Sequence, residues 1–138
     1  MKSNKIRIGV TGSRTFENKS KIKDFIFKLR EQTNSEIIIV GLGEKSGADK
    51  YVKRYALELG YQYQEANLPH TSVNLYSMMG ESYHGKPFTP KNFHIRNKIF
   101  AGYVDSCVVF DDTNGTDKIV SSVVAQLNKA RKKVVMIG

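Results

Sequence analysis

The chain has 138 residues, the length of one domain, and 40% of them are hydrophobic, which is enough for a core. Its 22 Lys and Arg residues exceed its 13 Asp and Glu residues, giving a formal charge of +9 that favours an anionic partner, although lysines on solvent faces of helices would give the same excess. The single cysteine, Cys107, excludes an intramolecular disulfide and is expected in the core. No apolar run approaches the roughly 20 residues of a membrane span, and the polar residues 1–5 leave no room for a signal peptide, so we expect a cytoplasmic protein without membrane contact.

The first half of the chain alternates strand-like and helix-like patterns. Residues 6–10 and 37–40 are near-continuous Ile/Val-rich runs, which are typical of strands covered on both faces. Between them, apolar residues spaced three and four apart over 22–29 predict a helix. A stronger apolar stripe over 48–59 predicts a second helix, which ends at Gly60. Residues 61–65 alternate aromatic and polar side chains and predict an edge strand.

A long connection, residues 66–88, then interrupts the alternation. Connections of this length are uncommon in compact domains and usually form functional lids or lack order. Tyr76, Met78 and Met79 offer an adaptable apolar surface, which predicts a lid over a ligand or a contact with a second subunit. A disordered surface insertion is the alternative.

The second half returns to the alternating pattern. Thr89 and Pro90 predict a helix start, with the helix running to about Val104. Apolar runs at 107–110 and 134–137 predict two more buried strands, and the stripe over 119–127 predicts the helix between them. Strands alternating with helices predict a single α/β domain of Rossmann-like type over residues 1–138, with a five-stranded parallel sheet in the order 3-2-1-4-5 and helices on both faces.

In such a sheet, ligands bind beyond the carboxyl ends of the strands, where the strand order reverses. The first strand leads into Gly12, Ser13 and Arg14, and the fourth is followed by Asp111 and Asp112 and then by Thr113, Asn114, Gly115 and Thr116. Glycine allows close approach to a phosphate, and arginine is a fork suited to phosphate oxygens. The alternatives are a common Asn-Gly turn, a helix cap at Thr116 and an ordinary exposed arginine.

Two further motifs are candidates for ligand contact. Ser46, Gly47 and Asp49 surround the start of the second helix, where Ser46 and Asp49 have the spacing of a capping box and could instead contact a ligand. Arg96 and Asn97 lie near a predicted packed face, unless Arg96 is a surface residue paired with an acid. His70, His84 and His94 lack the spacing of zinc sites, so we expect no metal, no cofactor and no covalent catalysis.

These motifs, taken in order, resemble the SLOG superfamily, which joins the Smf/DprA proteins with the LOG phosphoribohydrolases, and most closely its small stand-alone YspA- and YpsA-related members. The matching segments are residues 12–16, 46–49, 96–97 and 114–116. The resemblance implies a Rossmann-like fold and a pocket for a nucleotide or a nucleotide-derived ligand. LOG enzymes carry a Pro-Gly-Gly-x-Gly-Thr-x-x-Glu motif whose acid takes part in cleavage, and here Ile119 stands at that Glu position.

Three functions are consistent with these residues. The first is a sensor or sequestering protein for a nucleotide or an NAD- or ADP-ribose-like molecule, in which Arg14 and Arg96 neutralise phosphates. The second is a nucleotide N-glycosidase that uses Asp111, Asp112 or Asp117 in place of the missing Glu. The third is single-stranded nucleic-acid binding, which the charge favours although no row of aromatic residues is evident. Homo-oligomerisation is compatible with all three.

Overall fold

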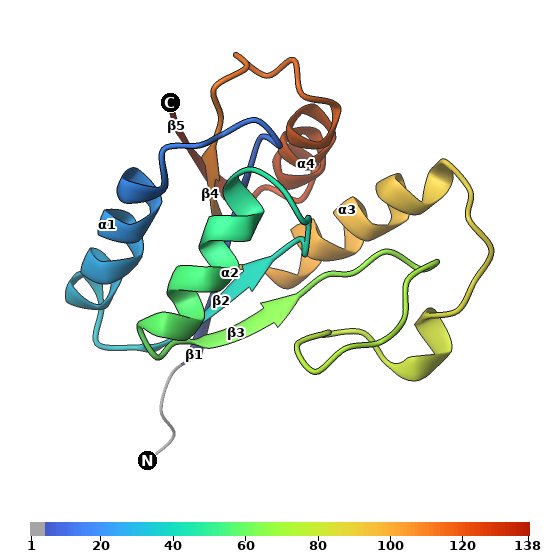
Figure 1. The fold of residues 1–138 in the computed structure, drawn as a ribbon, viewed down its shortest axis with the longest axis horizontal. Helices are drawn as coiled ribbons and strands as arrows, with labels where there is room; N and C mark the ends of the chain where they lie inside the picture. The colour runs from blue at the N-terminus through green and yellow to red at the C-terminus, as the bar shows by residue number, and fades with distance from the viewer. Residues whose placement is uncertain (1–4) are drawn as a thin grey trace.

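The computed structural model describes residues 5–138, which form a five-stranded parallel sheet with helices on both faces (Figure 1). Parallel pairing joins the strands in the order β3-β2-β1-β4-β5, as the sequence predicts. The strand and helix bounds, in chain order, are β1 (Lys5–Gly12), α1 (Lys19–Leu29), β2 (Glu36–Gly41), α2 (Ala48–Glu58), β3 (Gln62–Glu65), α3 (Lys91–Tyr103), β4 (Ser106–Phe110), α4 (Lys118–Lys129) and β5 (Lys133–Ile137).

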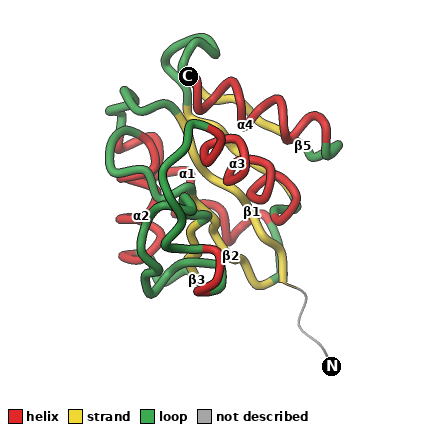
Figure 2. The backbone as a smooth tube through the Cα atoms, turned by 90° about the vertical axis from the view of Figure 1, so that its right-hand side faces the viewer, coloured by secondary structure: helices red, strands yellow, loops and turns green. Residues whose placement is uncertain are grey.

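The helices form two layers, with α1 and α2 packed on one face of the sheet and α3 and α4 on the other (Figure 2). The sheet thus has two cores, a first core under α1 and α2 and a second core under α3 and α4. Because successive strand residues point to opposite faces, β2 supplies Ile39 to the first core and Val40 to the second. Burial on both faces explains why β1, β2 and β4 are near-continuous apolar runs. Cys107 is fully buried in the second core, and burial raises the pKa of its thiol well above the ordinary value.

The strands at the two edges differ from the three inner ones. The edge position predicted for residues 61–65 is confirmed, because β3 is the terminal strand of the sheet and β2 is the one named strand that pairs with it. The prediction that residues 134–137 are covered on both faces is wrong. That segment is β5, the opposite edge strand, and Val135 and Met136 are more than 40% exposed.

The segment after β3 packs along the edge of that strand. The Glu65 N–H donates to the Tyr76 carbonyl at 2.8 Å, and the Met78 N–H donates to the Glu65 carbonyl at 2.9 Å, which extends the sheet by one short bridge. Tyr76 meets the Tyr63 ring at 5.7 Å, and Met78 and Met79 pack against the core beneath α3 and α4. These three partly buried side chains therefore anchor the segment to the domain, and the predicted lid or subunit contact stays a prediction.

No helix within residues 5–138 is long and apolar enough to cross a membrane. The predicted absence of a signal peptide concerns the first residues of the chain, of which 1–4 lie outside the part that the structure describes. Within residues 66–88, the only helical element is a short 3₁₀ turn, Glu81–Tyr83, and that segment leads directly to α3.

Candidate functional site

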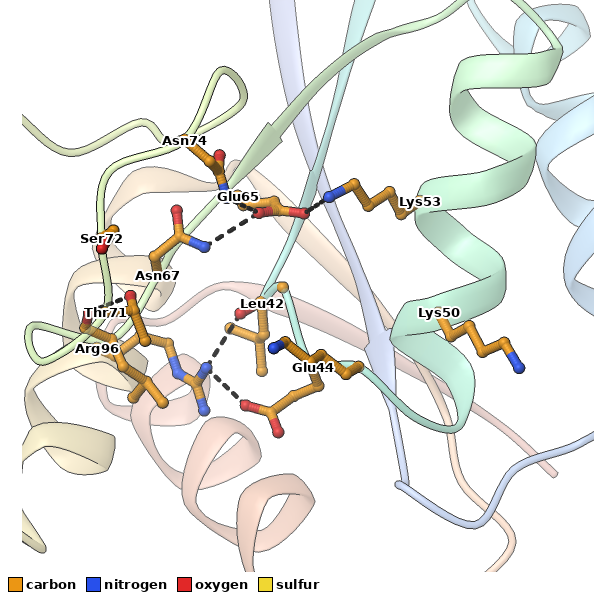
Figure 3. Close-up of a pocket in the computed structure, with 13 residues that line it drawn as sticks. Leu42, Glu44, Lys50, Lys53, Glu65, Asn67, Thr71, Ser72, Asn74 and Arg96 are labelled. Atoms are coloured by element: carbon orange, nitrogen blue, oxygen red, sulfur yellow. Dashed lines mark hydrogen bonds and ion pairs between the residues drawn. The ribbon is translucent and has the colours of Figure 1, made fainter.

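The carboxyl ends of the parallel strands meet at one edge of the sheet, where a cavity of about 470 Å³ opens beyond β2 and β3 (Figure 3). We call this hollow the β2–β3 cavity. Its walls come from the loop between β2 and α2, the first turns of α2, the segment after β3, and one side chain of α3, Arg96. Figure 3 shows the lysines of α2 on one side and the segment after β3 on the other.

Positive charge dominates the β2–β3 cavity. Its lining includes four cations against the carboxylates of Glu44 and Glu65, and these cations are Lys45, Lys50, Lys53 and Arg96. Lys53 Nζ lies 2.8 Å from Glu65 Oε1, and Arg96 Nη1 lies 3.0 Å from Glu44 Oε2. Within residues 5–138, Lys45 and Lys50 form no ion pair, so their charges remain available to an anion.

Arg96 is the most deeply buried charge in the cavity wall. Its Nε donates to Asn97 Oδ1 at 2.7 Å, and its Nη1 donates to the Leu42 carbonyl at 3.1 Å as well as to Glu44. Its side chain is 0% exposed, and Nη2 has no hydrogen-bond partner among the described residues. The alternative of a surface arginine is therefore wrong: Arg96 is a buried, fixed guanidinium whose terminal nitrogen Nη2 is unused.

Glu65, at the end of β3, anchors a polar network beside the cavity. Its Oε1 accepts from Lys53 and from the Tyr63 hydroxyl at 3.1 Å, and its Oε2 accepts from Asn67 Nδ2 and Asn74 Nδ2, each at 3.0 Å. Burial alone would raise the pKa of Glu65, but these donors outweigh burial and hold the pKa below its ordinary value. Sequence reasoning missed this network. The only signal was a charged residue at the inward-facing end of the predicted edge strand.

The capping-box prediction for Ser46 and Asp49 is wrong. The N-cap of α2 is Gly47, so no side chain caps this helix, and Ser46 is exposed. The buried Asp49 carboxylate instead accepts from Thr11 Oγ1 at 2.6 Å and from the N–H groups of Leu42 and Glu44, each at 3.1 Å. Asp49 therefore ties the cavity-forming loop after β2 to the end of β1.

The glycines of the first two loops are required by close packing of the chain. A Cβ on Gly12 would lie 1.9 Å from the Phe110 carbonyl oxygen, and one on Gly47 would lie 2.3 Å from the Ser13 carbonyl oxygen. Ser13 is itself fully buried, and its hydroxyl donates to Asp112 at 2.8 Å. These contacts account for the three residues without a ligand, and their predicted contact with a phosphate stays a prediction.

The loop between β4 and α4 satisfies its own backbone donors with carboxylates. Asp111 accepts from the N–H groups of Thr113 at 2.9 Å and Gly115 at 2.7 Å. Asp117 caps α4 by accepting from two further N–H groups, so the predicted cap at the exposed Thr116 is wrong. Asn114 and Gly115 have φ angles of 54° and 79°, which is the left-handed conformation that favours Asn and Gly. The carboxylates of Asp111 and Asp117 therefore already accept from the N–H groups that a phosphate at this loop would use.

The remaining predicted residues line a second hollow of about 280 Å³ between α3 and α4. Arg14 is 47% exposed there and pairs with Asp117 at 3.1 Å, and Asn97 Nδ2 donates to Ser122 at 3.0 Å. Ile119, at the position of the LOG glutamate, lines the same hollow. The predicted site residues are thus divided: Arg96 lies at the β2–β3 cavity, whereas Arg14 and Asn97 lie at the smaller hollow.

The fold is similar to those of two solved structures. The Moco carrier protein from Chlamydomonas reinhardtii matches with a TM-score of 0.61 and 19% identity, over 98% of this chain and 77% of that chain. TM1055, a structural genomics target, matches with a TM-score of 0.59 and 16% identity, over 95% of this chain and 72% of that chain. No protein-family model matches the sequence, and no curated protein matches it.

Fold and site together define a Rossmann-like α/β domain with a basic cavity at the carboxyl ends of its strands. Open parallel sheets hold small ligands beyond the carboxyl ends of their strands, where the strand order reverses, which here is between β1 and β4. The β2–β3 cavity lies at this same end of the sheet but to the side of that point.

Proposed function

We propose that the protein binds a nucleotide, or a related NAD- or ADP-ribose-derived molecule, in the β2–β3 cavity and acts as a sensor or sequestering protein. The observation that carries the proposal is the buried Arg96 guanidinium, whose Nη2 lacks a partner at a cavity that also holds Lys45 and Lys50. A phosphate oxygen supplies the acceptor that this donor lacks and the negative charge that the lysines favour. The cavity volume lies within the range of about 300–1,000 Å³ typical of small-molecule sites.

The SLOG resemblance supports the same conclusion, because Arg96 belongs to one of its motifs. The N-glycosidase alternative has less support. Ile119 brings no carboxylate to the LOG position, and the three neighbouring aspartates are held by hydrogen bonds within the protein: Asp111 by its own loop, Asp112 by Ser13 and Asp117 by the start of α4.

Single-stranded nucleic-acid binding also has less support. Arg54 and Lys23 lie over the Tyr55 ring, with Arg54 5.3 Å and Lys23 5.7 Å from its centre, but Tyr55 is buried and cannot stack on a base. Lys23 and Arg54 therefore bring positive charge to this part of α1 and α2 but no exposed aromatic ring.

Calorimetric titration with adenosine monophosphate, ADP-ribose and NAD tests the proposal, using Lys50→Gln and Lys23→Gln as a matched pair. Each lysine is exposed and lies over a tyrosine ring, at 5.4 Å for Lys50 and 5.7 Å for Lys23, but only Lys50 lines the cavity. We expect Lys50→Gln alone to weaken binding several-fold. Arg96→Gln should weaken it about 10- to 100-fold, since a charge-assisted hydrogen bond contributes roughly 1.5–3 kcal/mol.

Two results would overturn the proposal. One is the absence of binding by the folded wild-type protein to all three compounds. The other is an equal loss of affinity in the Lys50 and Lys23 variants, which would show that the compounds respond to net charge and not to the cavity.

A further inference from the structure

The lining of the β2–β3 cavity is polar and lacks rings. Within residues 5–138, its thirteen lining residues include no Phe, Tyr or Trp, and only Leu42 and Leu68 are large and apolar. Proteins commonly hold a nucleobase between aromatic or apolar side chains, because the base presents a flat π-face. Hydroxyl and phosphate groups have no such requirement and are held by charges and hydrogen bonds. The lining therefore suits the sugar phosphate of a nucleotide better than its base.

Asn67, which lines this cavity, holds a fixed, buried acceptor without a partner among the described residues. Its Nδ2 must face Glu65, because an ionised carboxylate only accepts hydrogen bonds, and the amide is therefore held with Oδ1 pointing away from Glu65. Glu65 itself has no capacity left for a ligand, since Lys53, Tyr63, Asn67 and Asn74 occupy its two oxygens. Asn67 is buried, and its Oδ1 has no partner among the described residues.

The two buried side-chain atoms that lack a partner in the described chain are Asn67 Oδ1 and Arg96 Nη2, and both residues line the same cavity. One atom is an acceptor and the other a charged donor. Buried polar groups without partners are rare in folded proteins, and both of these belong to residues that line one cavity, which suits a ligand that satisfies both. Such a ligand carries an anionic group for Arg96 and an O–H or N–H donor for Asn67.

We infer that the β2–β3 cavity recognises the ribose phosphate of its ligand, with a ribose hydroxyl donating to Asn67 Oδ1 and the phosphate accepting from Arg96, while the base remains outside. This inference rests on the proposed function, which it narrows to ligands selected by their sugar phosphate. It follows that a pentose phosphate without a base is itself a ligand.

Calorimetry on the wild-type protein with ribose 5-phosphate, adenosine monophosphate and phenyl phosphate tests the inference. Phenyl phosphate carries a phosphate and a ring but no hydroxyl donor. We expect ribose 5-phosphate and adenosine monophosphate to bind within about three-fold of each other, because the base adds little. Phenyl phosphate should bind at least about tenfold more weakly than ribose 5-phosphate, because it cannot donate a hydrogen bond to the fixed, buried acceptor of Asn67.

Asn67→Ala and Asn74→Ala form the matched pair of variants. Each removes one 3.0 Å hydrogen bond to Glu65 Oε2, but only Asn67→Ala removes an unused acceptor from the cavity. Asn67→Ala should bring the affinities for ribose 5-phosphate and phenyl phosphate together, and Asn74→Ala should keep them apart. If Asn67→Ala fails to fold, the wild-type ligand series still decides.

The outcomes separate the two proposals. Binding of adenosine monophosphate without binding of ribose 5-phosphate overturns the inference and leaves the proposed function standing. Equal affinity for phenyl phosphate and ribose 5-phosphate in the wild type, or an unchanged gap in Asn67→Ala, removes the role of Asn67. Binding of no compound in the series overturns the proposed function and the inference with it.

Discussion

Asp49 makes the stability of the fold depend on pH near neutrality. Its buried carboxylate faces three donors, the Thr11 hydroxyl and the N–H groups of Leu42 and Glu44. Burial nevertheless raises the pKa of Asp49 from 3.8 to about 7, because removal from water outweighs these hydrogen bonds. Between these two pH values, the folded protein holds a proton on Asp49 that the unfolded chain has released.

The sign of the effect follows from this proton. Because the folded state binds more protons, the free energy of unfolding falls as the pH rises from about 4 to about 7, and the Asp49 contribution stays constant at higher pH. With 1.36 kcal/mol per pKa unit, the fall between pH 5 and pH 8 is about 2–3 kcal/mol. For a domain of this size, that corresponds to a decrease in Tm of roughly 10 °C.

Urea denaturation of the wild type, Asp49→Asn and Asp24→Asn, at half-unit steps from pH 5 to pH 8, measures this fall. The amide introduced by Asp49→Asn can still accept from the two N–H groups and donate to Thr11, but it does not titrate. From pH 5 to pH 8, we expect the free energy of unfolding of Asp49→Asn to rise by about 2–3 kcal/mol relative to that of the wild type. Asp24, an exposed carboxylate on α1, is the control and should leave the pH profile parallel to the wild type. Parallel profiles for Asp49→Asn and the wild type would refute the reasoning.

Three more predictions concern loops and helix ends. Gly12→Ala should destabilise the protein by about 3 kcal/mol or more, because its Cβ would lie 1.9 Å from the Phe110 carbonyl oxygen. At Gly102 in α3, an added Cβ meets nothing within 4 Å, so Gly102→Ala should stabilise the protein by up to about 1 kcal/mol. Thermal melts of the two variants measure this difference in stability. Asp117→Ala removes the α4 cap and should lower the free energy of unfolding by about 0.5–2 kcal/mol in urea, and an unchanged value would contradict the cap. Amides of residues 66–88 should become protected from hydrogen exchange when adenosine monophosphate is added, and equal exchange with and without it would show that this segment is not a lid.

The fold was largely predictable from the sequence because each inner strand is buried on both faces. Burial on both faces requires apolar residues at successive positions, as in residues 6–10 and 37–40, whereas the alternation in residues 61–65 indicated an edge strand. The same reasoning failed for β5, because an apolar run does not distinguish an inner strand from an edge strand that leaves Val135 and Met136 exposed.

The site was less predictable, because its polar contacts join residues far apart in the chain. Arg96 was a candidate by resemblance, but its burial depends on Leu42 and Glu44, more than 50 positions away. Asn67 had no local signal, and the signal for Glu65 was only its inward-facing position at the end of the predicted edge strand, where a charged residue is usually exposed. Asp49 had the spacing of a helix cap, and only the position of the loop after β2 shows that its carboxylate points elsewhere.

The two margins of the sheet are unequal in their capacity to take another strand. Along β3, residues 76–78 already use the backbone groups of Glu65, and the ring of Tyr76 closes over that margin. Along β5, the outward backbone groups meet no further strand within residues 5–138, and Val135 and Met136 remain open beside Lys133. The margin at β5 is therefore the more open of the two, and it lies on the side away from the β2–β3 cavity. A strand added beside β5 would leave the mouth of the β2–β3 cavity unobstructed.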